Sequence, residues 1–173
     1  MKNIYLVGFM GTGKTTIGKL LAEKIKKKFV EMDSEIEKKE GKKIVDIFKE
    51  NGEAYFRRLE KELLKDLSRQ TDLVVSCGGG LICDDENLEI LKKTGLVINL
   101  LASPKTIYER TRFSLDRPLL NVSNPLDKIK ELLRKRMPFY RQAHYSIKTD
   151  NITAKEVVEK IVKILKKTYQ NEC

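Results

Sequence analysis

The sequence of 173 residues has no tryptophan, one histidine, three cysteines and four prolines. It contains no uncharged apolar run of about 18 residues, so we expect no membrane-spanning helix. Cys77, Cys83 and Cys173 are odd in number and have no metal-binding spacing with His144. This pattern argues against a disulfide framework and a zinc site, and it predicts a reduced, cytoplasmic protein.

Internal repeats, low-complexity segments and linkers are also lacking, so we expect a single domain over residues 1–173. We further expect a monomer, and the apolar run that begins at residue 4 leaves no room for a signal peptide. Charge, by contrast, is abundant, because 35 Lys and Arg residues outnumber 25 Asp and Glu residues. The lysines fall mostly on polar faces of expected helices, without a nucleic-acid-binding motif. The surplus therefore indicates solvated surfaces, and we expect neither a nucleic-acid nor a membrane partner.

A phosphate-loop pattern, G-x-x-x-x-G-K-[ST], is matched by residues 8–15, with the sequence GFMGTGKT. An apolar run typical of a buried strand precedes it, and apolar residues at the spacing of an amphipathic helix follow. In this order the glycines let backbone N–H groups and the positive end of the helix face a phosphate. Lys14 would reach the β- and γ-phosphates, and Thr15 would bind Mg²⁺ through its hydroxyl. The sequence therefore predicts a nucleoside triphosphate site.

Short apolar or β-branched runs predict further strands at residues 29–32, 73–77, 96–101 and 145–148. Capping patterns indicate helix starts at residues 34–37, 103–104 and 153–156, and helix stops are indicated at Asn51-Gly52 and Gly95. Strands and helices therefore alternate along the chain. This alternation predicts an α/β fold in which a parallel sheet is covered on both faces, with ligands at the carboxyl ends of the strands.

Two groups of residues directly follow predicted strands. Glu31 and Asp33 are separated by one residue, so in an extended strand both carboxylates would project to the same side. Alternatively, Asp33 is the cap of the next helix. Gly78, Gly79 and Gly80 leave no side chain after the third strand, which permits close approach of a ligand to the backbone. The alternative for the glycines is a merely flexible turn.

Arginines are concentrated in the middle and later chain, which suits a protein that holds ATP and an anionic substrate. Arg57 and Arg58 follow Phe56 near the start of a helix, where positive charge is unfavourable unless an anion lies nearby. A plain surface position is equally compatible with the sequence. Another arginine, Arg136, comes just before Pro138, which we expect to disrupt a helix.

The longest break in the helical pattern lies at residues 113–125, which contain two prolines and several turn residues. Such breaks are often lids over an active site. We therefore place a mobile lid at about residues 112–124, with Arg117 as its charged contact to phosphate.

The motifs found along the chain are residues 8–16, Asp33, Gly52-Glu53, Phe56-Arg57-Arg58, residues 78–80, residues 117–120 and Arg136-x-Pro138-x-Tyr140. Their order and spacing match those of one known family throughout the chain. Together they resemble the shikimate kinase family over essentially the whole chain. The resemblance implies a three-layer P-loop NTPase fold of the nucleoside-monophosphate-kinase-like group, with a five-stranded parallel sheet and a mobile lid. It also implies transfer of the γ-phosphoryl of ATP to the 3-hydroxyl of shikimate, a step toward chorismate and the aromatic amino acids, with Mg²⁺ as cofactor.

Individual roles follow from the resemblance alone. It implies that Asp33 binds the accepting hydroxyl, that Arg57 and Arg136 clamp the shikimate carboxylate, and that Gly79 supplies a backbone contact. It also implies that Arg110 lies against adenine beside the loop at residues 151–153. The expected catalytic residues are Lys14, Asp33 and Arg117. The expected ATP-binding residues are Gly11, Thr12, Gly13, Lys14, Thr15, Thr16, Arg110, Arg117 and Thr153.

The chain departs from the family at Glu31, because the family usually shows Asp-x-Asp where this chain has Glu31-Met32-Asp33. The first carboxylate is associated with the Mg²⁺ shell through water. Glutamate keeps the charge and extends it by about 1.5 Å, one C–C bond. Water-mediated binding can absorb that difference, because Mg²⁺ usually keeps several waters. We therefore expect activity to survive.

Two rival functions fit part of the sequence. A kinase of the same fold acting on another polyol acid, such as gluconate, would share the phosphate loop but does not predict the arginines and triple glycine. A non-catalytic nucleotide-binding regulator would predict degraded loops, whereas Lys14, Thr15 and Asp33 are all present.

Overall fold

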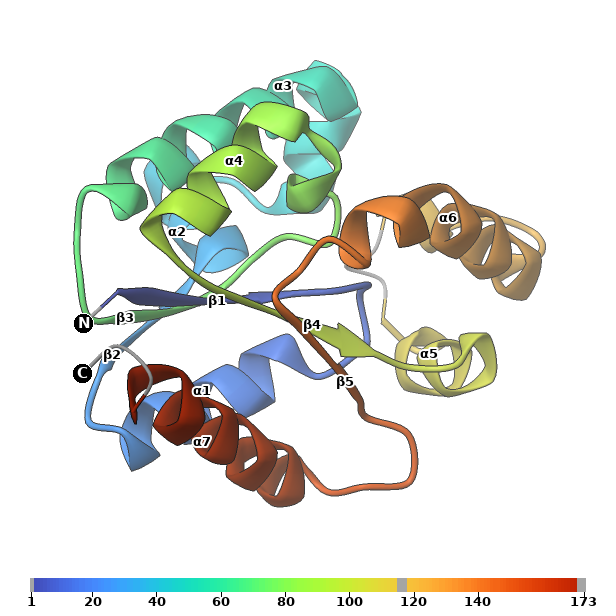
Figure 1. Ribbon diagram of the computed structural model, residues 1–173. Coiled ribbons are helices and arrows are strands. Elements are labelled where there is room, and N and C mark those ends of the chain that lie inside the picture. Colours follow the sequence, from blue (N-terminus) through green and yellow to red (C-terminus); the bar gives the residue numbers. More distant parts are fainter. Residues whose placement is uncertain (1, 115–117, 171–173) are drawn as a thin grey trace.

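The structure, a computed structural model, describes residues 2–114 and 118–170. Its centre is a five-stranded sheet in which all neighbouring strands are parallel, in the order β2-β3-β1-β4-β5 (Figure 1). The strands are β1 (Asn3–Val7), β2 (Lys28–Glu31), β3 (Leu73–Ser76), β4 (Gly95–Leu101) and β5 (Tyr145–Lys148). The predicted strands are therefore confirmed to within one residue at each end.

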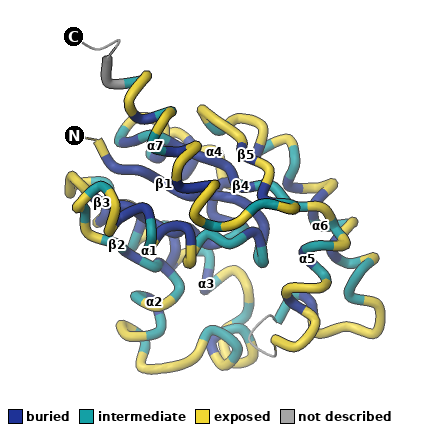
Figure 2. The backbone as a smooth tube through the Cα atoms, turned by 90° about the horizontal axis from the view of Figure 1, so that it is seen from below, coloured by how far each residue is buried: buried dark blue, intermediate teal, exposed yellow. Residues whose placement is uncertain are grey.

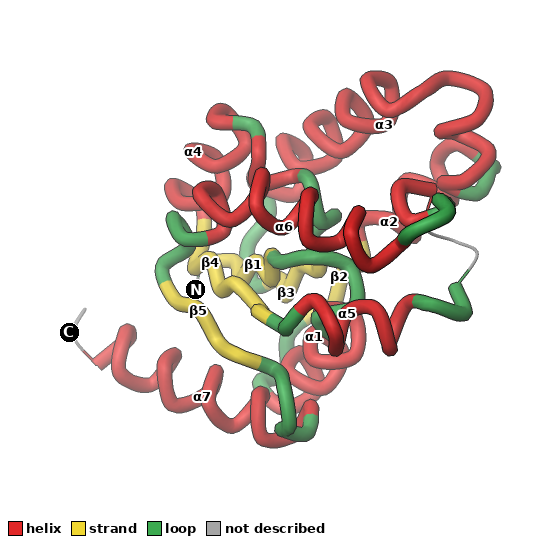
Figure 3. The backbone as a smooth tube through the Cα atoms, turned by 90° about the vertical axis from the view of Figure 1, so that its right-hand side faces the viewer, coloured by secondary structure: helices red, strands yellow, loops and turns green. Residues whose placement is uncertain are grey.

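Helices cover both faces of the sheet, so the three-layer α/β/α prediction is confirmed (Figure 1). One face carries α1 (Lys14–Lys24) and α7 (Ala154–Gln170), and the other carries α2 (Met32–Glu40), α3 (Ile44–Ser68) and α4 (Asp85–Thr94). Figure 3 faces the carboxyl ends of the strands, where α5 (Pro104–Thr111) and α6 (Pro125–Tyr140) lie nearest the viewer. Two 3-10 turns complete the described elements, η1 (Leu81–Cys83) and η2 (Pro118–Leu120).

The core follows the two-residue period of the strands. In β1, Ile4 and Leu6 pack with α1 and α7, whereas Tyr5 and Val7 pack with the helices of the other face. All four residues are fully buried. Figure 2 colours β1 as buried along its length. Burial of such a side chain stabilises the fold by about 1.5–3 kcal/mol. Because β1 lies between β3 and β4, the loop that follows it is held at the middle of the sheet edge.

Several predicted helix boundaries are confirmed. Ser103 accepts a hydrogen bond from the Thr106 N–H at the start of α5. Thr153 and Glu156 form the predicted capping box before α7, each side chain bonding the other's backbone N–H. Gly95 ends α4 and begins β4. In the described part of the chain, no helix combines the length and apolar character needed to cross a bilayer.

Two predicted boundaries need correction, at Ser34 and at Pro138. Ser34 does not start a helix, because α2 begins at Met32 and leaves Ser34 inside it. The stop at Gly52 is confirmed, because its non-helical φ of 80° and ψ of 173° separate the two helical parts of α3. Pro138 does not disrupt α6, which runs through it to Tyr140. A proline this near the end of a helix deprives it of only one late backbone hydrogen bond.

Candidate active site

A cavity of about 590 Å³ opens at the carboxyl ends of β1, β2 and β3. Its walls come from the phosphate loop, the start of α1, the β2–α2 junction, both parts of α3, the glycine turn after β3, η2 and α6. The volume lies within the range of about 300–1,000 Å³ that is usual for ligand sites. Sequence segments far apart in the chain therefore converge at the edge where α/β folds bind ligands.

The phosphate loop has the backbone shape that its glycines permit. Gly8 has φ 135°, and a Cβ there would lie 2.3 Å from the Leu100 carbonyl oxygen. Gly13, at φ 95°, is the N-cap of α1. The Lys14 ammonium donates to the carbonyl oxygens of Gly8 and Phe9 at 2.9 and 3.0 Å, so it lies across the loop at the positive end of a helix. This arrangement can hold the phosphates of a nucleotide.

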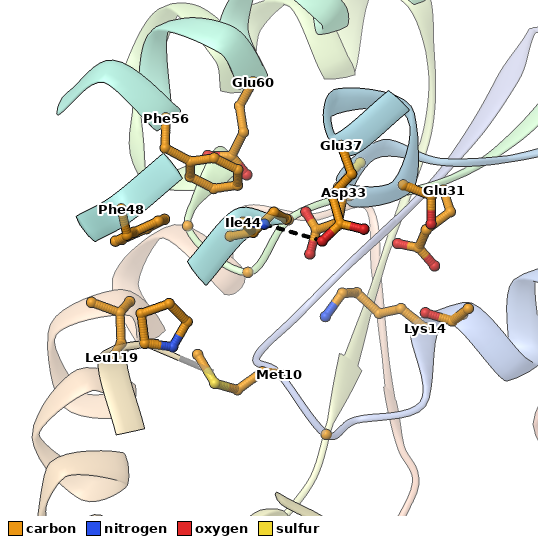
Figure 4. A pocket seen from close by; sticks show the side chains of 18 of the residues that line it. Met10, Lys14, Glu31, Asp33, Glu37, Ile44, Phe48, Phe56, Glu60 and Leu119 are labelled. Atoms are coloured by element: carbon orange, nitrogen blue, oxygen red, sulfur yellow. Dashed lines mark hydrogen bonds between the residues drawn. The ribbon is translucent and has the colours of Figure 1, made fainter. Parts of the chain in front are cut away.

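The carboxylates of Glu31 and Asp33 both line the cavity, on the same side as Lys14 (Figure 4). They do not project from one side of an extended strand, because β2 ends at Glu31 and α2 begins at Met32. The alternative that Asp33 caps α2 is wrong, since Glu31 occupies the cap position and Asp33 is already in the first helical turn. The strand-to-helix junction thus brings two carboxylates beside the phosphate loop.

Glu31 is held by β3, where Ser76 Oγ donates to Glu31 Oε1 at 3.0 Å. Burial raises the pKa of this carboxyl, while the Thr15 hydroxyl acts in the opposite direction. Its Oε2 atom is buried and makes no hydrogen bond of normal geometry within residues 2–114 and 118–170. The pairing with Ser76 accommodates the longer glutamate side chain and leaves one oxygen near Thr15.

These oxygen donors fit Mg²⁺, which prefers hydroxyl and carboxylate oxygens and retains several waters. Among the described residues, no group of three or more His, Cys, Asp or Glu side chains could hold a metal ion by itself. An ion beside Thr15 and Glu31 would therefore depend on water and on phosphate oxygens for its other ligands. That is the usual coordination of Mg²⁺ in nucleotide sites.

Arg57 reaches the cavity from α3 between two carboxylates. Its Nη2 atom lies 2.8 Å from Glu53 Oε1, and its Nη1 atom forms an ion pair with Glu60 Oε2. Glu60 is fully buried, and burial raises the pKa of its carboxyl to about 7 although Arg57 lowers it. Arg58 instead lies over the ring of Tyr55, at 4.9 Å, so the surface alternative holds for that residue.

The glycine turn after β3 is a packing requirement of α3. A Cβ at Gly78 would lie 1.8 Å from Glu60 Oε1, and a Cβ at Gly80 would lie 2.6 Å from Arg57 Cζ. Any larger residue at these two positions would displace the buried ion pair. The flexible-turn alternative therefore does not account for the glycines. In the described residues, the side chains that approach the backbone of Gly78 and Gly80 closely come from α3.

Arg136 enters the cavity from α6 and is only 8% exposed. Its guanidinium lies over the ring of Phe9, 5.5 Å from the centroid. One helical turn later, the Tyr140 hydroxyl donates to the Gly79 carbonyl oxygen at 2.6 Å and fixes α6 to the glycine turn. Arg57 and Arg136 thus line one cavity from two helices, with the glycine turn between them.

The sequence did not reveal an apolar wall of the cavity and one buried carboxylate. Figure 4 shows the wall opposite Lys14 and Glu31, formed by side chains from the phosphate loop, α3 and η2, namely Met10, Ile44, Phe48, Phe56 and Leu119. The carboxylate is Glu60. Its spacing of three residues from Arg57 is the one available signal, but it also fits an ordinary surface pair on a helix.

Other expected site residues have different surroundings. Gly11, Gly13, Thr15, Thr16 and Gly79 line the cavity, and Thr12 is buried beneath the loop, donating to the Phe9 carbonyl oxygen. Arg110 lies beyond the loop and donates to the Gly11 carbonyl oxygen at 3.1 Å. Thr153 caps α7, outside the cavity lining. Arg117 lies outside the described residues.

Comparisons with known proteins agree with this geometry. A sequence model of the family described as shikimate kinase matches residues 10–166. The shikimate kinase of Thermodesulfovibrio yellowstonii is 48% identical over 163 residues, covering 94% of each chain. That of Sulfurihydrogenibium sp. is 48% identical over 167 residues, covering 96% of this chain and 99% of the relative. The solved shikimate kinase from Acinetobacter baumannii in complex with shikimate superposes with a TM-score of 0.94 at 41% identity, covering 97% and 94% of the two chains. The chain therefore belongs to the shikimate kinase family.

Proposed function

We propose that this cavity transfers the γ-phosphoryl of ATP to the 3-hydroxyl of shikimate. The observation that carries the proposal is the placement of Lys14 and Asp33 in one cavity with Arg57 and Arg136. The first pair suits phosphoryl transfer to an alcohol, and the second suits an acceptor that bears a carboxylate. Family membership supports a kinase over a non-catalytic regulator and shikimate over gluconate.

Phosphoryl transfer depends on alignment and on neutralisation of charge. Lys14 would hold the β- and γ-phosphates, and Asp33 would orient the 3-hydroxyl and accept its proton late in the reaction. Thr15 would hold Mg²⁺ directly and Glu31 would hold it through water, so that the ion neutralises phosphate charge when bound. A lid at residues 112–124, with Arg117 over the phosphates, would exclude water. Gly79 would contact the substrate through its backbone.

We also propose a cytoplasmic monomer with no nucleic-acid partner. Cys77 and Cys83 are both free thiols, which suits a reducing compartment. On the surface shared by α1 and α7, Lys24 of α1 forms an ion pair with Glu159 of α7. This contact supports solvated helix faces as the reason for the positive charge.

The proposed substrate is tested by a coupled ADP-release assay that compares shikimate, quinate, gluconate and nucleoside monophosphates as acceptors. We expect turnover to be fastest with shikimate, because its ring carries both a carboxylate for the arginines and a hydroxyl for Asp33. Preferred use of gluconate or a nucleoside monophosphate would contradict the proposed function.

Arg136→Lys is expected to lower kcat/KM for shikimate by about 10- to 100-fold while leaving KM for ATP nearly unchanged. Lysine keeps the charge but lacks the planar fork that pairs with a carboxylate, and a hydrogen bond to a charged group contributes about 1.5–3 kcal/mol. Steady-state kinetics with each substrate varied in turn measure the effect. Arg134→Lys, on an exposed position of the same helix, is the control. A rise in KM for ATP alone would place Arg136 at the nucleotide.

Shikimate affinity is expected to fall about three- to tenfold between pH 6 and pH 8. Burial raises the pKa of Glu60 to about 7, so across this interval its carboxyl becomes charged beside Arg57. That charge opposes an incoming carboxylate, and a coupling of one pKa unit corresponds to a tenfold change in affinity. Isothermal titration calorimetry at several pH values measures it.

Glu60→Gln should flatten the dependence of shikimate affinity on pH. The variant retains His144, the only histidine in the sequence, so any effect of its titration would persist in the variant. An unchanged pH dependence in the variant would show that another group titrates. The raised pKa of Glu60 also makes the stability of the fold depend on pH.

Because the pKa in the folded state is raised above the ordinary 4.5, the stabilising contribution of protonated Glu60 is complete below pH 4.5 and is lost as the pH rises through about 7.

A further inference from the structure

Two segments distant in sequence are joined beyond the phosphate loop, at the edge of the sheet that carries β4 and β5. The Asp150 carboxylate, just after β5, accepts hydrogen bonds from the Ser103 N–H at 2.9 Å and from the Thr106 hydroxyl at 2.7 Å. Ser103 and Thr106 form the start of α5. Asp150 therefore fixes the first turn of this helix, where a negative charge is favoured by the helix dipole.

The other end of α5 is fixed to the same loop. Arg110 donates from Nη2 to the Thr149 carbonyl oxygen at 3.2 Å and from Nη1 to the Gly11 carbonyl oxygen at 3.1 Å. The two attachments, at Ser103 and Arg110, are about 10 Å apart along the helix. Consecutive residues of one loop, Thr149 and Asp150, thus hold both ends of α5. The helix cannot pivot unless one attachment is released.

The loop itself has a constrained shape. Asn151, directly after Asp150, has φ 56°, in the left-handed region that asparagine adopts more readily than most residues other than glycine. Thr153 then starts the cap of α7, so the loop is anchored on its far side as well.

The contacts between α5 and residues 149–150 lie beside the phosphate loop, and this position indicates their function. The cavity is lined by Asp33 and the phosphate loop, whereas Arg110 is absent from its lining. If the γ-phosphate is directed toward Asp33, the nucleoside would lie on the side of the loop away from Asp33. Arg110 binds the Gly11 carbonyl oxygen on that outward side. A Cβ at Gly11 would lie 2.9 Å from Thr111 Cγ2, so α5 packs directly against the loop. The nucleoside would leave the loop next to α5 and residues 149–153.

We propose that Asp150 is a positioning residue for the nucleoside of ATP, because it fixes the spacing between α5 and the loop after β5. The inference rests on the proposed use of ATP at the phosphate loop. Asp150 acts through Ser103, Thr106 and the helix that carries Arg110, and it makes no contact with the phosphates. Its effect should therefore fall on ligands that include a nucleoside and spare those that consist of phosphate alone.

The test compares the binding of ADP and of pyrophosphate to Asp150→Asn by calorimetry. The amide has the shape of the carboxylate but carries no charge. Its oxygen can replace Oδ1, which accepts from both Ser103 and Thr106, but its NH₂ group then replaces Oδ2 and faces the Ser103 N–H, which Oδ2 accepts at 3.2 Å. We expect the Kd of ADP to rise about five- to tenfold, while the Kd of pyrophosphate changes by less than about twofold. In turnover, KM for ATP should rise while kcat at saturating ATP and KM for shikimate are retained.

Asp84→Asn is the matched control, because Asp84 accepts from the Asn87 N–H at the start of α4, away from the nucleotide. It should change neither Kd. If Asp150→Asn is too unstable to assay, Thr106→Val removes one of the same hydrogen bonds and should weaken ADP in the same direction. Equal weakening of ADP and pyrophosphate, or unchanged ADP binding in both variants, would overturn the proposal. The binding test is independent of the acceptor, so a failure to phosphorylate shikimate would not be mistaken for failure of this inference.

Discussion

Lys14→Ala is expected to lower the rate of phosphoryl transfer by about 10²–10³-fold, the usual result of removing one fixed electrostatic contact from a transition state. Lys14 is the first residue of α1, and its ammonium lies across the phosphate loop on the Gly8 and Phe9 carbonyl oxygens. In the reaction it would shift from these neutral acceptors to the charged oxygens of the transferring group. Alanine leaves that charge without its nearest protein cation.

The comparison requires that the phosphate loop itself survive the substitution. Lys14→Ala loses the two hydrogen bonds of the ammonium to the loop carbonyls but retains Gly8, Gly13 and the Thr12 hydrogen bond to Phe9. Melting temperature should therefore remain near that of the wild type. Lys19→Ala, on an exposed position of the same helix, is the control for loss of a positive charge. Near-normal turnover by folded Lys14→Ala would remove the phosphate loop from the mechanism.

The phosphate loop and the strands could be predicted because their causes are local. A glycine at φ 95° before Lys14 is required by the turn into α1, and that requirement is visible in the motif itself. The central strands β1, β3 and β4 are buried on both faces, so their apolar runs are nearly continuous and their limits are sharp. Arg136 was predicted from family resemblance, and its burial over Phe9 could not have been read from the residues around it.

The buried ion pair of Arg57 and Glu60 shows why the rest of the site was not predictable. A spacing of three residues on a helix is found in many exposed pairs of little energetic importance. The glycine turn at residues 78–80 packs closely against this pair, and burial raises the pKa of the carboxyl. That turn is far from α3 in sequence. Local patterns therefore identified the arginine and missed its partner.

The placement of Glu31 and Asp33 at the β2–α2 junction could not be predicted for a related reason. Glu31 and Asp33 were expected to share one side of a strand, but the chain turns into α2 between them. The Ser76 hydroxyl on the neighbouring strand holds Glu31, so the long side chain lies along β3 while Asp33 reaches the cavity from the first helical turn. Side chains stop alternating with a period of two residues where the chain changes from strand to helix within three residues.

That placement makes Asp33→Asn the sharpest test of the chemistry. Asparagine keeps the shape of the side chain and removes its charge and its capacity to accept a proton. If Asp33 orients and deprotonates the 3-hydroxyl, kcat should fall by about 10²–10⁴-fold, the usual range for loss of a general base. Nucleotide binding should be nearly unchanged, since the contacts of Lys14 with the loop remain.

Stability provides the second half of the Asp33 test. Asp33 and Glu35 are the two acidic residues in the first turn of α2, and each contributes about 0.3–1 kcal/mol through the helix dipole. Glu35→Gln loses the same kind of charge without lining the cavity, so it should match Asp33→Asn in melting temperature and the wild type in kcat. Measuring both quantities on each variant separates helix stabilisation from chemistry. If stable Asp33→Asn turned over shikimate at the wild-type rate, the proton would have to leave by another route and the role of Asp33 would be wrong.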